Sequence, residues 1–245
     1  MRSVLVRASR LIRTAAASLV RPGALVLAAA LASIATVPAA RAQELLFDYV
    51  GFDYEDPVVV PGLFGGVGNG YIGLGEVPVL LSPLVSDQTN YEYTYVLTGA
   101  TSLSRLVSGP FVVITYSGPA TLTIYEDSRS TGTAFDYGVN PPNGTAPPSF
   151  IDGTAILVGE ITDFFYIFNT ATGSGSYDAS FEAVGGTQLG DIPVDQRTGW
   201  TFAGTTTNTA SIPEGYDHQV DGQTFLNKPT PATAASWGAI KRKYR

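Results

Sequence analysis

The side chains that could carry out acid–base or metal chemistry in this chain are mostly carboxylates. The sequence has 21 Asp and Glu residues, a single histidine, His218, and no cysteine. A Ser-His-Asp triad would have to use His218 as its base, but no Gly-x-Ser-x-Gly turn follows Gln43. His218 shares an expected strand face with Tyr216 and Val220, so we predict a hydrogen-bonded or surface strand residue. A zinc site would have few suitable ligands, because the chain has no thiolate and only one imidazole.

Acidic loops are the remaining candidates for a metal site. Ca²⁺ binds several oxygen atoms at once, and acids cluster at Asp53-Glu55-Asp56, at Glu126-Asp127, and at Asp191 with Asp195. We take Glu126, Asp127, Asp191 and Asp195 as calcium candidates, although none has EF-hand spacing. An acidic exterior that keeps the protein soluble explains the same residues without an ion. Ca²⁺ is the only cofactor that the sequence brings into consideration.

Paired carboxylates can also hydrolyse glycosidic bonds, with one acid protonated and the other ionised across a cleft. Glu126, Glu160 and Glu182 fall in or beside expected strands, where a jelly-roll hydrolase would carry such a pair. The 27 aromatic residues offer rigid faces for sugar or protein, although most of them must fill the core. Carbohydrate is therefore the partner expected under this alternative.

Seven glycines crowd the fourteen residues 62–75, GLFGGVGNGYIGLG. The run is not a phosphate-binding loop, because it lacks the Gly-Lys-Ser/Thr sequence and the following helix that such loops need. A calcium-binding nonapeptide would need a carboxylate where Gly70 stands. We interpret the run as a Gly-rich loop or irregular edge where the backbone passes close to another strand.

The elements that must position these groups are short strands. Alternation of apolar and polar residues is clearest in Ser176–Val184 and Tyr91–Leu97, and after Ala42 no segment has helical spacing over three turns. Ala155–Ile161 and Phe164–Phe168 are apolar on both faces, so we expect them to be central strands. Phe111–Tyr116 and Leu122–Tyr125 are expected to form a hairpin joined by Ser117-Gly118-Pro119. Two further strands are expected at Trp200–Thr206 and Tyr216–Val220.

The number of strands sets the expected architecture. About eight to ten short strands separated by Gly, Pro, Asn and Ser clusters predict an all-β, antiparallel β-sandwich or jelly roll, with a closed β-barrel as the alternative. We expect one β domain over residues 43–226, with the Gly-rich segment 62–75 inside it.

Residues 1–42 resemble an export signal peptide. Five arginines in residues 1–21 precede an uncharged stretch rich in Ala, Leu and Val over residues 22–40, and Ala40-Arg41-Ala42 is a signal-peptidase pattern. We expect cleavage after Ala42 and a secreted, extracellular or cell-surface protein. An uncleaved membrane anchor and an organellar transit peptide are the competing interpretations.

Removal of residues 1–42 makes the chain strongly acidic. It takes away six arginines and no acid, leaving 8 basic against 21 acidic residues and a formal net charge of −13. Only four basic residues remain in residues 43–240. Nucleic acid is therefore not an expected partner, because its phosphates must be neutralised by Lys and Arg.

The C-terminal residues differ in composition from the domain. A Pro/Thr/Ala linker, residues 227–236, precedes a basic aromatic tail, residues 237–245. Nine residues are too few for a helix that persists alone in water, so the tail should order only on a partner such as the cell envelope or extracellular matrix. The tail consists of apolar or aromatic residues at helical spacing and four basic residues: Trp237, Ile240 and Tyr244, with Lys241, Arg242, Lys243 and Arg245.

The placement of this tail resembles the C-terminal sorting tails of bacterial secreted proteins, although the Pro-Glu-Pro signature of one such type is missing. A flexible basic end docked on the domain by one aromatic residue is the alternative. We therefore expect a non-catalytic bacterial protein, displayed at the cell surface or released, with a binding or structural role. A carbohydrate-active hydrolase with paired carboxylates in a jelly-roll cleft is the competing function.

Overall fold

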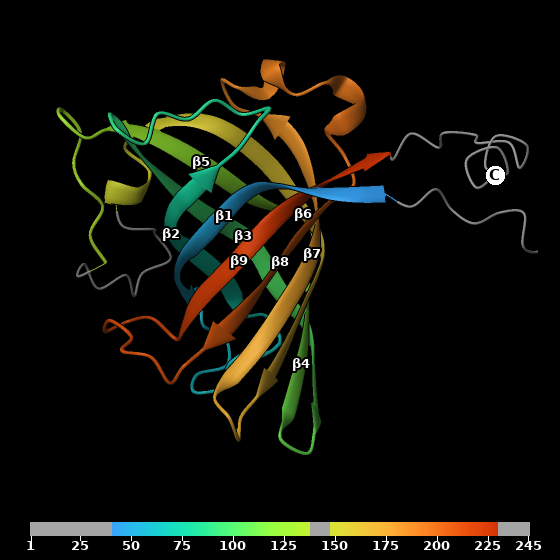
Figure 1. Cartoon of the computed structure of the whole chain (residues 1–245). Helices are drawn as coiled ribbons and strands as arrows, with labels where there is room; N and C mark the ends of the chain where they lie inside the picture. Colours follow the sequence, from blue (N-terminus) through green and yellow to red (C-terminus); the bar gives the residue numbers. More distant parts are fainter. Residues whose placement is uncertain (1–40, 138–147, 230–245) are drawn as a thin grey trace, which may run out of the picture. The chain divides into compact units, whose positions relative to one another are not determined.

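The computed structural model describes residues 41–137 and 148–229, which form an eight-stranded antiparallel barrel with one extra strand (Figure 1). The strands are β1 Arg41–Glu55, β2 Gly70–Leu80, β3 Tyr91–Ser108, β4 Phe111–Tyr116, β5 Ala120–Ser128, β6 Thr154–Asn169, β7 Ser174–Gly185, β8 Trp200–Thr207 and β9 His218–Pro229. Three short 3₁₀ helices lie between them: η2 Pro148–Phe150, η3 Leu189–Asp191 and η4 Val194–Gln196.

Closure of the sheet decides between the two predicted architectures. The strand order is β2-β1-β9-β8-β7-β6-β4-β3-β5, and further pairings of β2 with β3 and of β5 with β6 close the ring. The predicted all-β antiparallel class is confirmed. Within that class the structure is the closed barrel, the predicted alternative, and the sandwich or jelly roll is wrong, because the strands form one continuous ring.

Strands β4 and β5 occupy one position of the barrel in succession. β4 lies between the second halves of β3 and β6, and β5 lies between the first halves of the same two strands. Both run antiparallel to both neighbours, so the chain continues straight through residues 117–119. The predicted hairpin of Phe111–Tyr116 and Leu122–Tyr125 is therefore wrong. The tripeptide interrupts the ladder, since Pro119 has no N–H to donate.

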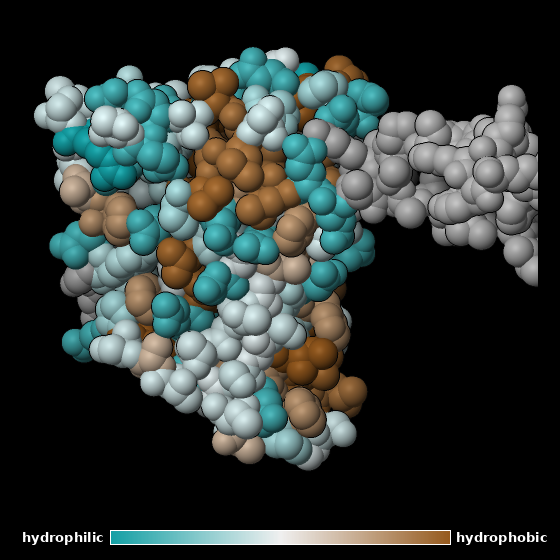
Figure 2. Space-filling model, viewed as in Figure 1, coloured by the Kyte–Doolittle hydropathy of each residue, from teal (hydrophilic) through white to brown (hydrophobic). Residues whose placement is uncertain are grey.

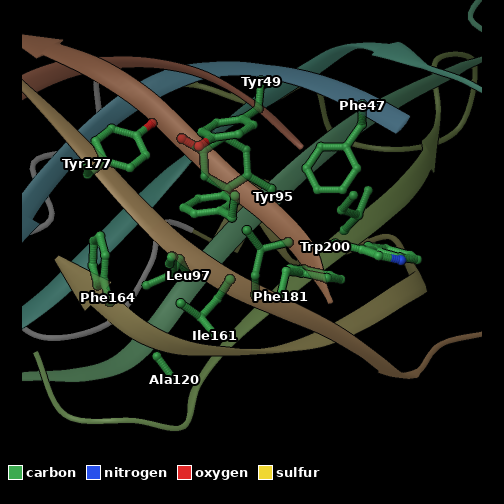
Figure 3. Close-up of a cluster of buried hydrophobic side chains, with 14 of the residues drawn as sticks. Phe47, Tyr49, Tyr95, Leu97, Ala120, Ile161, Phe164, Tyr177, Phe181 and Trp200 are labelled. Atoms are coloured by element: carbon green, nitrogen blue, oxygen red, sulfur yellow. The ribbon is translucent and has the colours of Figure 1, made fainter. Parts of the chain in front are cut away.

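Aromatic side chains fill the interior of the barrel (Figure 3). Tyr49 of β1 stacks on Phe202 of β8 with ring centroids 4.8 Å apart, and Phe181 of β7 stacks on Trp200 of β8 at 5.0 Å. Along β7 the predicted alternation is confirmed, with aromatic and alanine side chains buried and most of the intervening polar ones exposed. The interior is a packed core, as expected for a barrel of this strand number.

Strand β6 differs from its prediction in two ways. Ala155–Ile161 and Phe164–Phe168 belong to one long strand, which is irregular between Thr162 and Phe165. Asp163 in this irregularity has a φ of 54°, as a β-bulge allows. The strand is also not buried on two faces: Phe165 is 37 % exposed, because a barrel wall has a core only on its inner side.

Glycines let β1 and β2 approach closely. Gly51 and Gly75 are register partners. A Cβ on Gly75 would lie 2.1 Å from the Val50 carbonyl oxygen, and one on Gly51 would lie 2.0 Å from the Leu74 carbonyl oxygen. The predicted close approach in the Gly-rich run is therefore confirmed for its last residues, which belong to β2.

The chain contacts define one compact unit over Arg41–Lys228. β1 begins two residues before the predicted mature start, Gln43, and β9 takes the first three residues of the predicted linker, 227–236. The rest of the linker, the predicted signal up to Ala40 and the tail Trp237–Arg245 lie outside the described residues. In the described part, no helix has the length and apolar character needed to cross a bilayer.

Candidate functional site

The β1–β2 loop, residues 56–69, folds across the lower end of the barrel in Figure 1, and we call it the plug. The ring of Phe64 packs against His218 and Phe168, with centroids 4.4 and 6.2 Å away. Arg105 Nε of β3 donates to the Phe64 carbonyl oxygen at 2.9 Å. The plug is therefore anchored to the barrel by both ring packing and a hydrogen bond.

Glu55 and Asn69 hold the two ends of the plug. Glu55 Oε1 accepts a hydrogen bond from Gly65 N at 2.6 Å, and Oε2 accepts one from Asn69 Nδ2 at 2.9 Å. Asn69 is fully buried, and its Oδ1 accepts the backbone N–H groups of Val59 and Val60 at 2.8 and 2.7 Å. Burial raises the pKa of Glu55 to about 7, an effect larger than the opposing one of its two hydrogen bonds.

His218 and Asp53 form a buried pair beneath Phe64. His218 Nδ1 lies 2.9 Å from Asp53 Oδ1, and the two residues are 3 % and 0 % exposed. Burial by itself lowers the pKa of His218, but the charge of Asp53 and their hydrogen bond, with smaller contributions from Asp217 and Glu55, raise it above its usual value. His218 is thus the hydrogen-bonded strand residue that the sequence predicted, and not a surface one.

A cavity of about 470 Å³, which we call the rim cavity, opens between the plug and the β8–β9 loop. It is lined by Tyr54, Glu55, Val58, Gly62, Leu63, Phe64, Gly215 and Asp217. Tyr54 is only 2 % exposed, and its hydroxyl has no hydrogen-bond partner among the described residues. Asp217 is solvent-exposed, yet the protein atoms around its carboxylate and the charge of Asp53 raise its pKa to about 6.

A second cavity, of about 310 Å³, lies at the opposite end of the barrel and has Glu76, Glu92 and Arg129 in its lining. Arg129 is 4.0 Å from Glu92, so a cation already accompanies the acids there. The only charged residues that line the rim cavity are the acids Glu55 and Asp217.

The four calcium candidates are distributed over three elements. Glu126 and Asp127 are near the end of β5, where Glu126 accepts a hydrogen bond from the Tyr93 hydroxyl at 2.7 Å. Asp191 belongs to η3 and Asp195 to η4, and both are exposed. Within residues 41–137 and 148–229, no three His, Cys, Asp or Glu side chains form a group that could hold one metal ion. The calcium site stays a prediction.

The carboxylates predicted for hydrolysis do not meet in the rim cavity. Glu160 of β6 and Glu182 of β7 are register partners and are exposed on the barrel wall, while Glu126 belongs to β5. The acids that share a cavity are Glu55 and Asp217 instead. Asp217 was not singled out from the sequence, and only its position beside His218 could have drawn attention to it.

The surface also carries an apolar patch on the β3–β4 hairpin, toward the lower right of Figure 2. Leu106, Val107 and Phe111 are 64, 54 and 46 % exposed there. Apolar side chains alone do not specify the chemistry of a partner, so the rim cavity is the better-defined candidate site.

No protein-family model, curated protein or solved structure matches this chain. The rim cavity, the plug and the pair of Asp53 and His218 are the features of the structure that bear on function. Of these, the cavity is the feature that a small molecule could enter.

Proposed function

We propose that this protein is a non-catalytic binding protein that acts outside the cytoplasm and takes a small ligand in the rim cavity. The observation that carries the proposal is the rim cavity itself, which Glu55 and Asp217 line together with the apolar side chains of Val58, Leu63 and Phe64. A volume of about 470 Å³ lies in the usual range for small-molecule sites.

Two of the reactive groups in and beside the cavity, Glu55 and His218, are engaged in structural contacts. Both oxygens of Glu55 hold the plug, Nδ1 of His218 is bonded to Asp53, and Phe64 packs against the imidazole ring. A general base must come within hydrogen-bond reach of the proton it removes. These contacts favour binding over catalysis.

A cavity-filling variant tests this proposal. Val58→Trp should fill the rim cavity, and Val194→Trp, at an exposed position on η4, is the matched control. We expect at least one of four probes, an amine, a sugar, a carboxylate and an aromatic alcohol, to raise the melting temperature of the wild type and the control but not of Val58→Trp. Probes that leave every melting temperature unchanged, or that shift Val58→Trp equally, would argue against the cavity as a site.

Export is the second part of the proposal. Its support is the arginine-rich start of the chain, the uncharged stretch 22–40 and the Ala40-Arg41-Ala42 pattern. Intact mass spectrometry of fractionated native cells and medium tests it. A species that runs from Gln43 to Arg245 supports export, whereas a retained N-terminus would indicate a membrane-anchored protein.

The basic tail supports retention at the cell envelope. Trp237–Arg245 combines three apolar or aromatic residues with four basic ones, a composition suited to an anionic surface. Deletion of these residues should move the protein from the envelope fraction to the medium. The melting temperature should stay unchanged, because the barrel core lies within Arg41–Lys228. If the truncated protein is distributed between envelope and medium as the full-length protein is, the tail is not a sorting signal.

A carbohydrate-active hydrolase is the second candidate, favoured by one observation. Glu55 and Asp217 line the same cavity, and their pKa values of about 7 and about 6 would let one be protonated while the other is ionised. Turnover of aryl glycosides that is lost in Asp217→Asn, with the circular dichroism unchanged, would support it. Wild-type turnover no faster than buffer alone would count against it.

A further inference from the structure

The charge around the rim cavity is negative and incompletely balanced. The acids in and beside the cavity outnumber the cations near it: Asp53, Glu55, Asp56 and Asp217, against His218 and Arg105. The charge of His218 is paired with that of Asp53, and Arg105 is bonded to the Phe64 carbonyl oxygen behind the plug. A cation would be attracted to this site, and an anion such as phosphate would be repelled.

Two polar atoms here lack partners. The Tyr54 hydroxyl and Asp56 Oδ2 are both buried and have no hydrogen-bond partner among the described residues. A carboxylate oxygen can only accept, and a hydroxyl can accept as well as donate. Of these two residues only Tyr54 lines the cavity, and Asp56 adds negative charge beside it.

The remaining walls are apolar. Phe64, Leu63 and Val58 line the same cavity as Glu55 and Asp217. Aromatic faces attract ammonium groups as well as hydrocarbon. The described residues hold no group of three metal-ligating side chains. Apolar walls and few anionic ligands fit an organic cation better than a bare metal ion.

We propose that the rim cavity binds a small organic amine in its protonated form, with the ammonium group between Glu55 and Asp217 and the apolar part against Phe64 and Leu63. This inference rests on the proposed binding function and specifies its ligand class. Glu55 can take part while it holds the plug, because an ionised carboxylate has about four acceptor sites and Gly65 and Asn69 use two.

Binding of a cation should be linked to proton release. Burial raises the pKa of Glu55, the protein atoms around its carboxylate raise that of Asp217, and the charge of Asp53 adds to both effects. An ammonium ion beside these carboxylates would favour their ionised forms and lower both pKa values. Affinity should therefore rise between about pH 5 and about pH 8, provided that the amine itself stays protonated over this range.

Benzylamine and benzyl alcohol have similar shapes, but only the amine is charged, so comparing their binding tests the contribution of the ligand's charge. Isothermal titration of the full-length mature protein should detect benzylamine, with at least about tenfold weaker binding of the alcohol. The benzylamine affinity should increase from about pH 5 to about pH 8, and titrations in buffers of different ionisation enthalpy should show released protons.

A matched pair of variants tests whether the ammonium group of benzylamine lies beside Asp217. Asp217→Asn removes an acid of the cavity and should weaken benzylamine about tenfold, whereas Asp221→Asn, at an exposed position on β9, should not. Equal binding of amine and alcohol, no benzylamine binding, unchanged binding in Asp217→Asn, or displacement of the amine by Ca²⁺ would each overturn the inference. A sugar that binds and is blocked by Val58→Trp would leave the binding function intact while refuting the cation.

Discussion

The hydrogen bond between His218 Nδ1 and Asp53 Oδ1, 2.9 Å long, joins the first and the last strand of the barrel. β1 and β9 are also neighbours in the strand order of the barrel. The pair therefore joins the two ends of the barrel sequence where they meet, 165 positions apart. Phe64 packs on the same imidazole, so His218 contacts both β1 and the plug.

Removal of one member of this pair should destabilise the domain strongly. His218→Phe suits the aromatic surroundings but leaves the carboxylate of Asp53 buried without a cation, with only the Tyr166 hydroxyl as a donor at 3.5 Å. Breaking a buried charge pair in this way costs about 3–5 kcal/mol. The double variant Asp53→Leu/His218→Phe removes both charges and should recover part of that loss. Urea denaturation measures each value, with the exposed Glu182→Gln as a control that should change stability little. A loss below about 1 kcal/mol in His218→Phe would contradict a structural role for the pair.

The stability of the domain should fall as the pH rises from about 5 to about 8. The folded-state pKa values of Glu55 and Asp217 lie above their ordinary values, at about 7 and about 6, so the native chain keeps protons that the unfolded chain has released. The pKa of His218 is raised too, and its contribution is complete below its ordinary value near 6.5 and is lost as the pH passes the folded value. All three groups act in the same direction.

Urea midpoints measured across this pH range test the sign. Asp217→Asn should flatten the fall up to about pH 6, and Glu55→Gln should flatten it up to about pH 7. Asp48 is not a suitable control, because its pKa is raised as well. Stability that increases steadily from about pH 5 to about pH 8 would show that these carboxyl groups do not keep their protons in the folded chain.

Local patterns in the sequence predicted the strands better than their arrangement. The alternation in Ser176–Val184 predicted β7 with the correct buried face, because the inward and outward directions of side chains depend only on the period of the strand. The closed ring depends on pairings such as β2 with β3 and β1 with β9, which no local pattern contains. The hairpin predicted around residues 117–119 is wrong for a similar reason. Turn-forming residues show that a strand is interrupted, but they do not show in which direction the chain continues.

The candidate site was only partly visible in the sequence. Asp53, Glu55 and Asp56 stood out as a possible source of calcium ligands, but the fold gives them different surroundings. Asp53 lies next to His218, Glu55 holds the plug, and Asp56 has a buried oxygen with no partner among the described residues. Asp53 and Glu55 are two positions apart in β1 and so share one side of the wall, while Asp56 follows the end of the strand. Only the structure shows what each carboxylate meets there.

The plug should depend on Asn69. Asn69→Ala leaves the backbone N–H groups of Val59 and Val60 without their acceptor and removes the donor to Glu55, at a cost of about 1–3 kcal/mol. Hydrogen exchange should accelerate across residues 59–65 while the core strands stay protected. Asn208→Ala, at an exposed position in the β8–β9 loop, is the control. Unchanged exchange in Asn69→Ala would mean that the packing of Phe64 and the hydrogen bonds made by Arg105 and Glu55 hold the plug without Asn69.

Gly159 should tolerate no larger side chain. It is buried in β6, and a Cβ at this position would lie 2.0 Å from the ring of Phe181, which stacks on Trp200. Gly159→Ala should therefore force the ring pair to shift and cost about 1–3 kcal/mol, because the packed interior leaves little room for it. Gly190→Ala is the matched control, since nothing lies within 4 Å of its added Cβ. Equal melting temperatures for the two variants would show that the barrel interior accommodates the extra methyl group.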